Sequence, residues 1–344
     1  MKFVIKRLLP APALAFILCL PGTASASSVL LTETFTGTTA ADWTLLGSAQ
    51  LTAKAGIDPT GSGWLRMTGA VNNEAAFAFD NTAVPFGYGI DVTFHYSTWG
   101  GTGADGFGFV LFDGSTTPTS AGGYGGSLGY AQRSGVDGLA GGILGIGFDE
   151  FGNFANPTEG RQGGIGFVPD TITIRGPGDG TANAKAANGS VNYAYLTSTG
   201  ALPSADLVTG GQGSVRPTGV AAQRTAEIIA DTSQIPSGHL PIQVYLTVGN
   251  GTRTLVAQYD AYQQVLQYYG NDPAKIPSSI KFGFTGSTGS ENNNHEIQGL
   301  QVVSVQNAPG YAAVAPEPGA MGTMAIGLAL VAFGLYRKRS RTQN

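Results

Sequence analysis

Cysteine and charge are both scarce in this sequence. The single cysteine among 344 residues, Cys19, lies in an N-terminal apolar run that we expect to be removed. The mature chain would then have neither a disulfide framework nor a thiolate metal site. Only 12% of the residues are charged, and 21 acidic residues face 11 basic ones between Ser27 and Gly310, a net charge of −10. An acidic body without clustered lysine and arginine argues against nucleic acid as a partner.

Helical periodicity is also scarce, and only residues 259–269 are plausible as a short helix. The chain contains 53 glycines, and 42% of it is hydrophobic. Short apolar runs separated by this many turn formers predict one large all-β domain. We predict that this domain comprises residues 27–306. Apolar residues alternate with polar ones from Ile90 to Tyr96, which indicates a half-buried strand with His95 on its outer face. The polar region from 176 to about 218 is expected to form surface loops.

Both ends of the sequence carry targeting signals. Residues 1–26 have basic residues, an apolar run and the small residues Ala24-Ser25-Ala26, which is typical of a secretory signal peptide. After a predicted linker at 307–315, residues 316–344 contain Pro316-Glu317-Pro318, an uncharged apolar stretch from 319 to 336 and a basic tail. The apolar stretch is just long enough to be a transmembrane helix.

The C-terminal segment resembles the bacterial PEP-CTERM sorting signal. All three parts of that signal are present in the right order: the Pro-Glu-Pro motif, one membrane helix and a basic tail. The resemblance implies that an exosortase processes the chain during export, with the membrane as a partner only before processing. A permanent single-pass anchor has the same topology and remains the alternative. We therefore expect an exported protein, located in the cell envelope or outside the cell.

Two glycine-punctuated segments carry the candidate chemistry. They read ADGFGFVLFDG from Ala104 to Gly114 and LGIGFDEFGNF from Leu144 to Phe154. Each has strand periodicity, and each has an aspartate at one end, Asp105 and Asp149. A sheet that placed the two strands side by side would bring these carboxylates to one edge.

These segments, with GGYGGSLG before the second and FGFTGSTGSENNNHEI late in the chain, resemble successive signature segments of the L-type (legume-type) lectins. Their order matches, and the similarity extends from about Phe35 to Val305. It implies a concanavalin A-like jelly-roll sandwich. It also implies a non-proline cis peptide at Ala104-Asp105 and a variable sugar-specificity loop from Gly289 to Asn294.

The resemblance assigns a sugar site and a calcium site. Asp105 matches the aspartate that accepts hydrogen bonds from sugar hydroxyls, Gly126 lies in the loop whose backbone N–H meets the sugar, and Asn153 matches an asparagine that binds sugar and calcium. Asp149 and the carbonyl of Phe151 match further calcium ligands. Calcium accepts carboxylate, amide and carbonyl oxygens together. The alternatives are a turn residue for Asp105 and loop capping for Asp149 and Asn153.

The chain departs from the plant lectins at a second metal site. The glutamate and histidine that bind a transition metal there are replaced by Gly147 and, approximately, Gly164. We therefore predict calcium without a transition metal, with Glu159 or Asp179 as a further calcium carboxylate.

Three functions compete for this sequence. The first is a calcium-dependent carbohydrate-binding protein that takes part in surface adhesion or in an exopolysaccharide or biofilm matrix, with a glycan or exopolysaccharide as its partner. The second is a glycoside hydrolase, which needs two carboxylates flanking the bond; Asp149 and Glu150 are sequence neighbours and should diverge. The third is a structural matrix protein without sugar affinity. We predict the first, with no catalytic residues.

Overall fold

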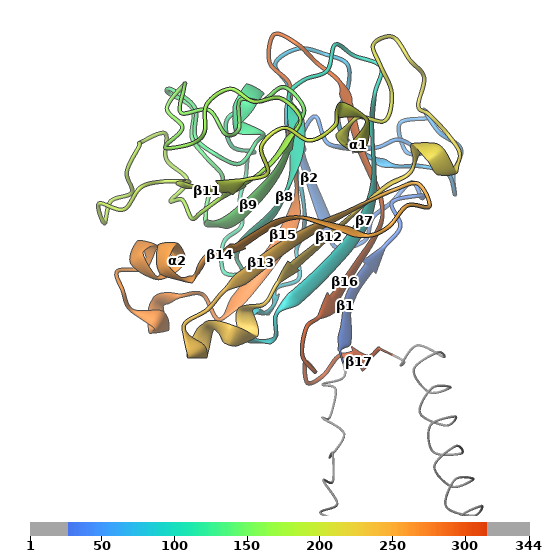
Figure 1. Ribbon diagram of the computed structural model, residues 1–344. Helices are drawn as coiled ribbons and strands as arrows, with labels where there is room; N and C mark the ends of the chain where they lie inside the picture. The colour runs from blue at the N-terminus through green and yellow to red at the C-terminus, as the bar shows by residue number, and fades with distance from the viewer. Residues whose placement is uncertain (1–26, 315–344) are drawn as a thin grey trace, which may run out of the picture.

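The described part of the protein consists of two antiparallel sheets packed face to face (Figure 1). The computed structural model describes residues 27–314. The strands of the first sheet, sheet A, are β1 (Ser28–Glu33), β3 (Gln50–Leu51), β4 (Leu65–Thr68), β7 (Ile90–Trp99), β12 (Arg224–Ala230), β13 (Pro241–Val248), β14 (Thr254–Asp260), β16 (Asn294–Ser304) and β17 (Ala312–Ala313). Those of sheet B are β2 (Trp43–Gly47), β5 (Ala75–Asp80), β6 (Val84–Pro85), β8 (Gly106–Asp113), β9 (Gly142–Asp149), β10 (Thr171–Arg175), β11 (Tyr195–Ser198) and β15 (Ser279–Ser287). The predicted all-β sandwich is confirmed.

Strands far apart in the sequence are neighbours in both sheets. The order is β14-β13-β12-β7-β16-β1-β17 in sheet A and β11-β10-β9-β8-β15-β5-β2 in sheet B, with β3 and β4 beside β16 and β6 beside β15. Helices are few and short in residues 27–314: α1 (Ser204–Leu207), α2 (Tyr262–Tyr268), η1 (Phe86–Tyr88), η2 (Gly125–Ser127), η3 (Val220–Ala222), η4 (Thr232–Ser237) and η5 (Pro273–Lys275). None of these helices is long and apolar enough to cross a bilayer.

The main core lies between the sheets and follows the alternation read from the sequence. In β7, Ile90, Val92 and Phe94 are fully buried, whereas His95 is exposed on the outer face, as predicted. Phe94 packs edge-on against Phe284 of β15, with ring centroids 4.9 Å apart. Because successive strand residues point to opposite faces, one apolar series per strand is enough to fill this layer.

A second apolar cluster covers the outer face of sheet B. In β8, Phe107 and Phe109 face the main core, while Val110 and Phe112 belong to the second cluster. Tyr193, in the polar region expected to be surface loops, is fully buried in this cluster. That expectation is therefore wrong for part of the region, because the loops between about 115 and 200 fold over the sheet (Figure 1).

Asp91 in β7 is a largely buried carboxyl without a hydrogen bond to its Oδ1. Burial raises its pKa to about 6; Glu227 on β12 adds to this, and Arg253 opposes it. The folded pKa lies above the unfolded value, so the carboxylate destabilises the fold most at neutral pH and not at all below about pH 4. We expect Asp91→Asn to raise the free energy of unfolding at pH 7.5. Denaturant titration should find that gain shrinking as the pH falls through 6; an equal gain at pH 4 would contradict the explanation.

The two ends of the described chain meet on one edge of sheet A. β17 pairs with the start of β1, with Ala313 opposite Ser28 and Ala312 opposite Val29. Part of the predicted linker at 307–315 is thus a strand, and Ala308 is buried. The predicted signal peptide (1–26) and PEP-CTERM segment with its helix at 319–336 lie outside the described residues.

Candidate functional site

The two segments expected to carry the chemistry lie side by side. Gly106 at the start of β8 pairs with Asp149 at the end of β9. The backbone N–H groups of Glu150 and Phe151 donate to the carbonyl of Asp105, at 3.0 and 3.2 Å. The peptide bond before Asp105 is cis, as the lectin resemblance implies. One end of sheet B therefore brings both aspartate segments together.

A small polar pocket of about 80 Å³ opens at this end. The three residues predicted to bind sugar, Asp105, Gly126 and Asn153, all line it, together with Phe151. The loop predicted to set sugar specificity lines it too, through residues 289–291. Pockets that enclose a drug-sized ligand measure roughly 300 to 1,000 Å³. This pocket instead has room for the edge of one small polar ring.

Asp105 is the pocket's unsatisfied acceptor. Its side chain is only 4% exposed, and its Oδ2 has no hydrogen-bond partner in the described structure. Burial raises the pKa of Asp105 to about 7, against the opposing charges of His295 and Arg161. A buried acceptor without a donor costs free energy. A ligand that brought hydroxyl donors into the pocket would remove that cost.

Gly126, in the η2 turn, allows the Asn153 loop to approach closely. A Cβ at position 126 would overlap the Cβ of Asn153 and lie 3.3 Å from Nη2 of Arg161. Gly289 has a related role on the other wall, where a Cβ would be 3.0 Å from Oδ2 of Asp105. Glycine at both places therefore brings the polar side chains of the pocket within reach of one small ligand.

Asn153 is oriented by a neighbour in its own loop. Its Oδ1 accepts a hydrogen bond of 3.0 Å from Nδ2 of Asn156. The amide nitrogen of Asn153 is then the group that remains for a ligand, because an amide offers one acceptor oxygen and two N–H donors.

Asp149 is fully buried and caps the loop that follows it. Its Oδ1 accepts from the backbone N–H of Gly152 at 2.7 Å, and its Oδ2 accepts from that of Phe154 at 2.6 Å. Burial raises the pKa of Asp149 to about 7, and the two backbone hydrogen bonds counteract part of the rise. These two hydrogen bonds are the loop capping that the sequence analysis named as the alternative role of Asp149.

The residues around Asp149 do not fit calcium well. Calcium prefers six to eight oxygens, which carboxylates, amide and backbone carbonyls and water supply together. Residues 27–314 contain no group of three or more acidic, histidine or cysteine side chains placed to hold a metal ion. Both oxygens of Asp149 and the Oδ1 of Asn153 already accept hydrogen bonds. The predicted ligand set of Asp149, Phe151 and Asn153 thus offers a single carboxylate, and hydrogen-bond donors already contact both of its oxygens.

Both residues expected to supply a further carboxylate already have hydrogen-bond donors beside them. Glu159 pairs with Arg133 at 2.6 Å and with Arg161 at 3.1 Å. Asp179 accepts hydrogen bonds from Thr181 and Asn192. At the transition-metal position, the ring of Phe154 fills the space where a side chain at Gly147 would lie.

Two buried arginines near the pocket were missed by sequence reasoning. The side chain of Arg161 is 0% exposed, and it hydrogen-bonds to Ser127 next to Gly126. Arg175 of β10 is fully buried and donates to four backbone carbonyl groups, those of Phe154, Gln162, Gly163 and Tyr193. Burial lowers the pKa of Arg175 to about 9. Arginine is rarely fully buried, so the sequence offered no signal for either role.

Glu150 belongs to a separate polar cluster behind the pocket. It is buried, its Oε2 accepts from Asn293 at 2.9 Å, and its Oε1 lies 3.7 Å from Nε2 of His295. His295 in turn contacts the Thr68 hydroxyl at 2.6 Å. Asp149 and Glu150 therefore engage different partners, as expected for neighbours on an extended segment.

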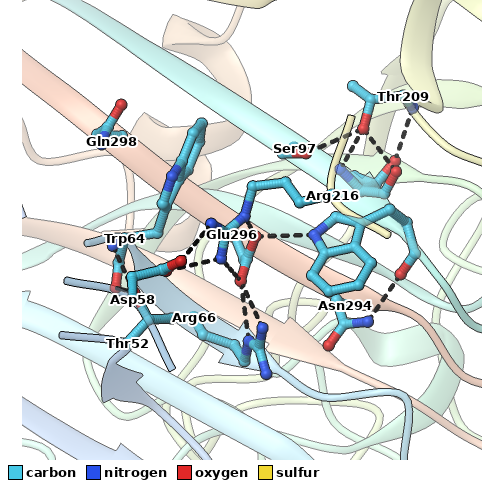
Figure 2. A network of polar contacts seen from close by, with 12 residues as sticks. Thr52, Asp58, Trp64, Arg66, Ser97, Thr209, Arg216, Asn294, Glu296 and Gln298 are labelled. Carbon is cyan, nitrogen blue, oxygen red and sulfur yellow. Dashed lines mark hydrogen bonds and ion pairs between the residues drawn. The ribbon is translucent and has the colours of Figure 1, made fainter. Parts of the chain in front are cut away.

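An ion network that shares no residue with this pocket surrounds Glu296 of β16, in sheet A (Figure 2). Glu296 is 0% exposed and lies between Arg66, at 2.8 Å, and Arg216. It also accepts from the indole of Trp99, and Arg216 forms a second ion pair with Asp58 at 2.8 Å. The contacts of Glu296 with Arg66, Arg216 and Trp99 all lie within the protein, which makes its role structural.

Comparison with solved structures identifies the fold. The chain is similar to the Lotus tetragonolobus seed lectin, with 18% identity and a TM-score of 0.52 over 81% of this chain and 100% of that one. It is also similar to peanut lectin with a 9mer peptide, with 15% identity and a TM-score of 0.51 over 81% of this chain and 98% of that one. No protein-family model and no curated protein matches the sequence. The protein therefore has the legume-lectin jelly-roll fold.

Proposed function

We propose that this chain is an exported carbohydrate-binding protein whose pocket at Asp105, Gly126 and Asn153 takes the hydroxyl edge of one sugar ring. The observation that carries the proposal is the buried Oδ2 of Asp105, which lines the pocket without a hydrogen-bond partner. Neighbouring hydroxyls of a sugar would donate to that carboxylate, and Asn153 would donate to the same ring. The two solved structures of this fold cited above are named as lectins, which supports the proposal.

Binding without hydrolysis fits the carboxylates of the site better than catalysis. A glycosidase of the common kind flanks the scissile bond with two carboxyl groups about 5 to 10 Å apart. Here the oxygens of Asp149 accept backbone N–H groups of its own loop, and Glu150 accepts from Asn293. Neither carboxyl lines the pocket that Asp105 lines.

The place of action is part of the same proposal. The leader and the C-terminal segment predicted from the sequence support export to the cell envelope or the extracellular matrix, where an exopolysaccharide or another glycan would be the partner. An exosortase would act on the precursor during export. Calcium dependence, which the lectin resemblance implies, finds less support in the donor set than sugar binding does.

A glycan array probed with the purified protein tests the function. Binding to a defined set of glycans, competed by the corresponding free sugar, is the expected result, and incubation with those glycans should release no reducing sugar. Sugar release would identify a hydrolase. Absence of binding across the array would favour a structural matrix protein.

Gly126→Ala should weaken glycan binding about tenfold, because the added methyl group displaces Asn153 from the pocket and removes its hydrogen bond to the ligand. Isothermal titration with the best array sugar measures the change. Gly211→Ala is the matched control, since no atom lies within 4 Å of a Cβ there. Unchanged affinity in Gly126→Ala would place the sugar elsewhere.

A further inference from the structure

We infer that the buried guanidinium of Arg161 takes the structural role that a metal ion would have in this pocket. It fixes the Asn153 loop against the Gly126 turn, and glycan binding therefore needs no calcium. The inference rests on the proposed function and specifies how the sugar-binding residues are held. It also explains why the donor set around Asp149 does not fit a divalent cation.

Arg161 connects the two loops that carry the predicted sugar contacts. Its Nε donates to the carbonyl of Asn156 at 3.1 Å, and its Nη2 donates to Thr158 at 3.0 Å and to Glu159 at 3.1 Å. Its Nη1 donates to the hydroxyl of Ser127 at 3.0 Å, across to the turn that contains Gly126. One cation thus binds oxygens from both loops, which is how a bound metal ion would hold them.

The positive charge of Arg161 lies near carboxylates that could otherwise attract a metal ion. The guanidinium is buried, and the carboxylates of Asp149 and Glu159 both favour its charged form, although burial itself lowers its pKa. Arginine remains protonated in proteins and offers five donors in a rigid fork, so it can satisfy several oxygens at once. A divalent cation placed beside it would be repelled.

The oxygen of Asn153 is held without metal as well. Asn156 donates to it, and the same Asn156 is bound through its carbonyl by Arg161. The chain Arg161–Asn156–Asn153 therefore orients the amide that faces the ligand. Arg175 donates to the carbonyls of Phe154 and Gly163, which flank the segment that contains Asn156 and Arg161.

The first experiment needs no variant. Glycan binding and thermal unfolding of the wild-type protein are measured in excess EDTA and in calcium chloride. We expect the same affinity and the same melting temperature in both, because a ligand stabilises a fold only when it binds the folded state. Binding that is lost in EDTA and restored by calcium would overturn the inference and leave the proposed function standing.

The proposed function and the inference about Arg161 can fail independently of each other. If the wild type binds no glycan under either condition, the proposed function fails. The thermal measurement still tests the inference, because a melting temperature raised by calcium would show that the folded protein binds the ion and would count against it.

A variant then tests the positioning role. Arg161→Gln should lower glycan affinity about tenfold, because the Asn153 amide is then no longer held in place to donate its hydrogen bond to the ligand. Arg66→Gln is the matched control: it also removes a largely buried, ion-paired arginine, but on sheet A, so it should lower the melting temperature without changing affinity. If Arg161→Gln binds as tightly as Arg66→Gln, the guanidinium does not position the site.

Discussion

Asp105→Asn will lower glycan affinity by about ten- to a hundredfold while the protein stays folded. The carboxylate accepts hydrogen bonds from sugar hydroxyls in the proposed complex, and a hydrogen bond to a charged group contributes about 1.5 to 3 kcal/mol. Asparagine has nearly the same size but one acceptor oxygen. Because Asp105 is buried and its Oδ2 is unpaired, we expect the melting temperature of the variant to equal or exceed that of the wild type. Titration calorimetry and thermal unfolding provide the two readouts.

The control for this prediction lies at the other end of the same strand. Asp113 ends β8 and accepts hydrogen bonds from the backbone and hydroxyl of Ser115. Asp113→Asn makes the same chemical change away from the pocket and should leave affinity unchanged. If Asp105→Asn binds its glycan as tightly as Asp113→Asn does, the sugar site lies elsewhere.

Glu296→Gln will have the largest effect on stability, a loss of about 3 to 5 kcal/mol in the free energy of unfolding. Glu296 is fully buried among Arg66, Arg216 and Trp99, as Figure 2 shows for the two arginines. Glutamine preserves the shape but removes the charge, which leaves Arg66 without its ion-pair partner. Arg216 keeps Asp58. Denaturant unfolding followed by tryptophan fluorescence measures the loss.

An exposed ion pair provides the contrast. Glu227 pairs with Arg253, whose side chain is nearly half exposed. Surface pairs contribute roughly 0 to 1 kcal/mol, so Glu227→Gln should cost little. Similar losses in both variants would show that the sheet A network contributes no more than an ordinary surface contact.

Much of the fold could be predicted because strand periodicity is local information. The alternation from Ile90 to Tyr96 predicted both the strand and the outward side chain of His95, and β7 has both. The covered outer face of sheet B could not be predicted in this way. Val110 and Phe112 are buried by the loop that carries Tyr193, and strand periodicity holds no information about a contact so distant in the sequence.

The candidate site could be predicted only in part, for a related reason. The lectin resemblance gave Asp105, Gly126 and Asn153, and the structure brings all three to one pocket. It did not give Arg161, because whether an arginine in a loop is exposed or buried depends on contacts with another loop, here with Ser127. The calcium ligands followed from the same motif, but a motif does not show which of its oxygens are already occupied.

The pairing of β1 with β17 places the two ends of the described chain far from the pocket. Ser304 of β16 lies opposite Ile90 at one end of β7, close to the paired chain ends, whereas Asn294 lies opposite Trp99 at the other. Asn293 binds the backbone of Gly101 on the approach to Asp105, so the pocket belongs to that other end. Ten strand residues span about 33 Å. Ser27 and Val314, the two ends of the described chain, therefore lie at the base of the sandwich, and the pocket lies about the full height of the domain away.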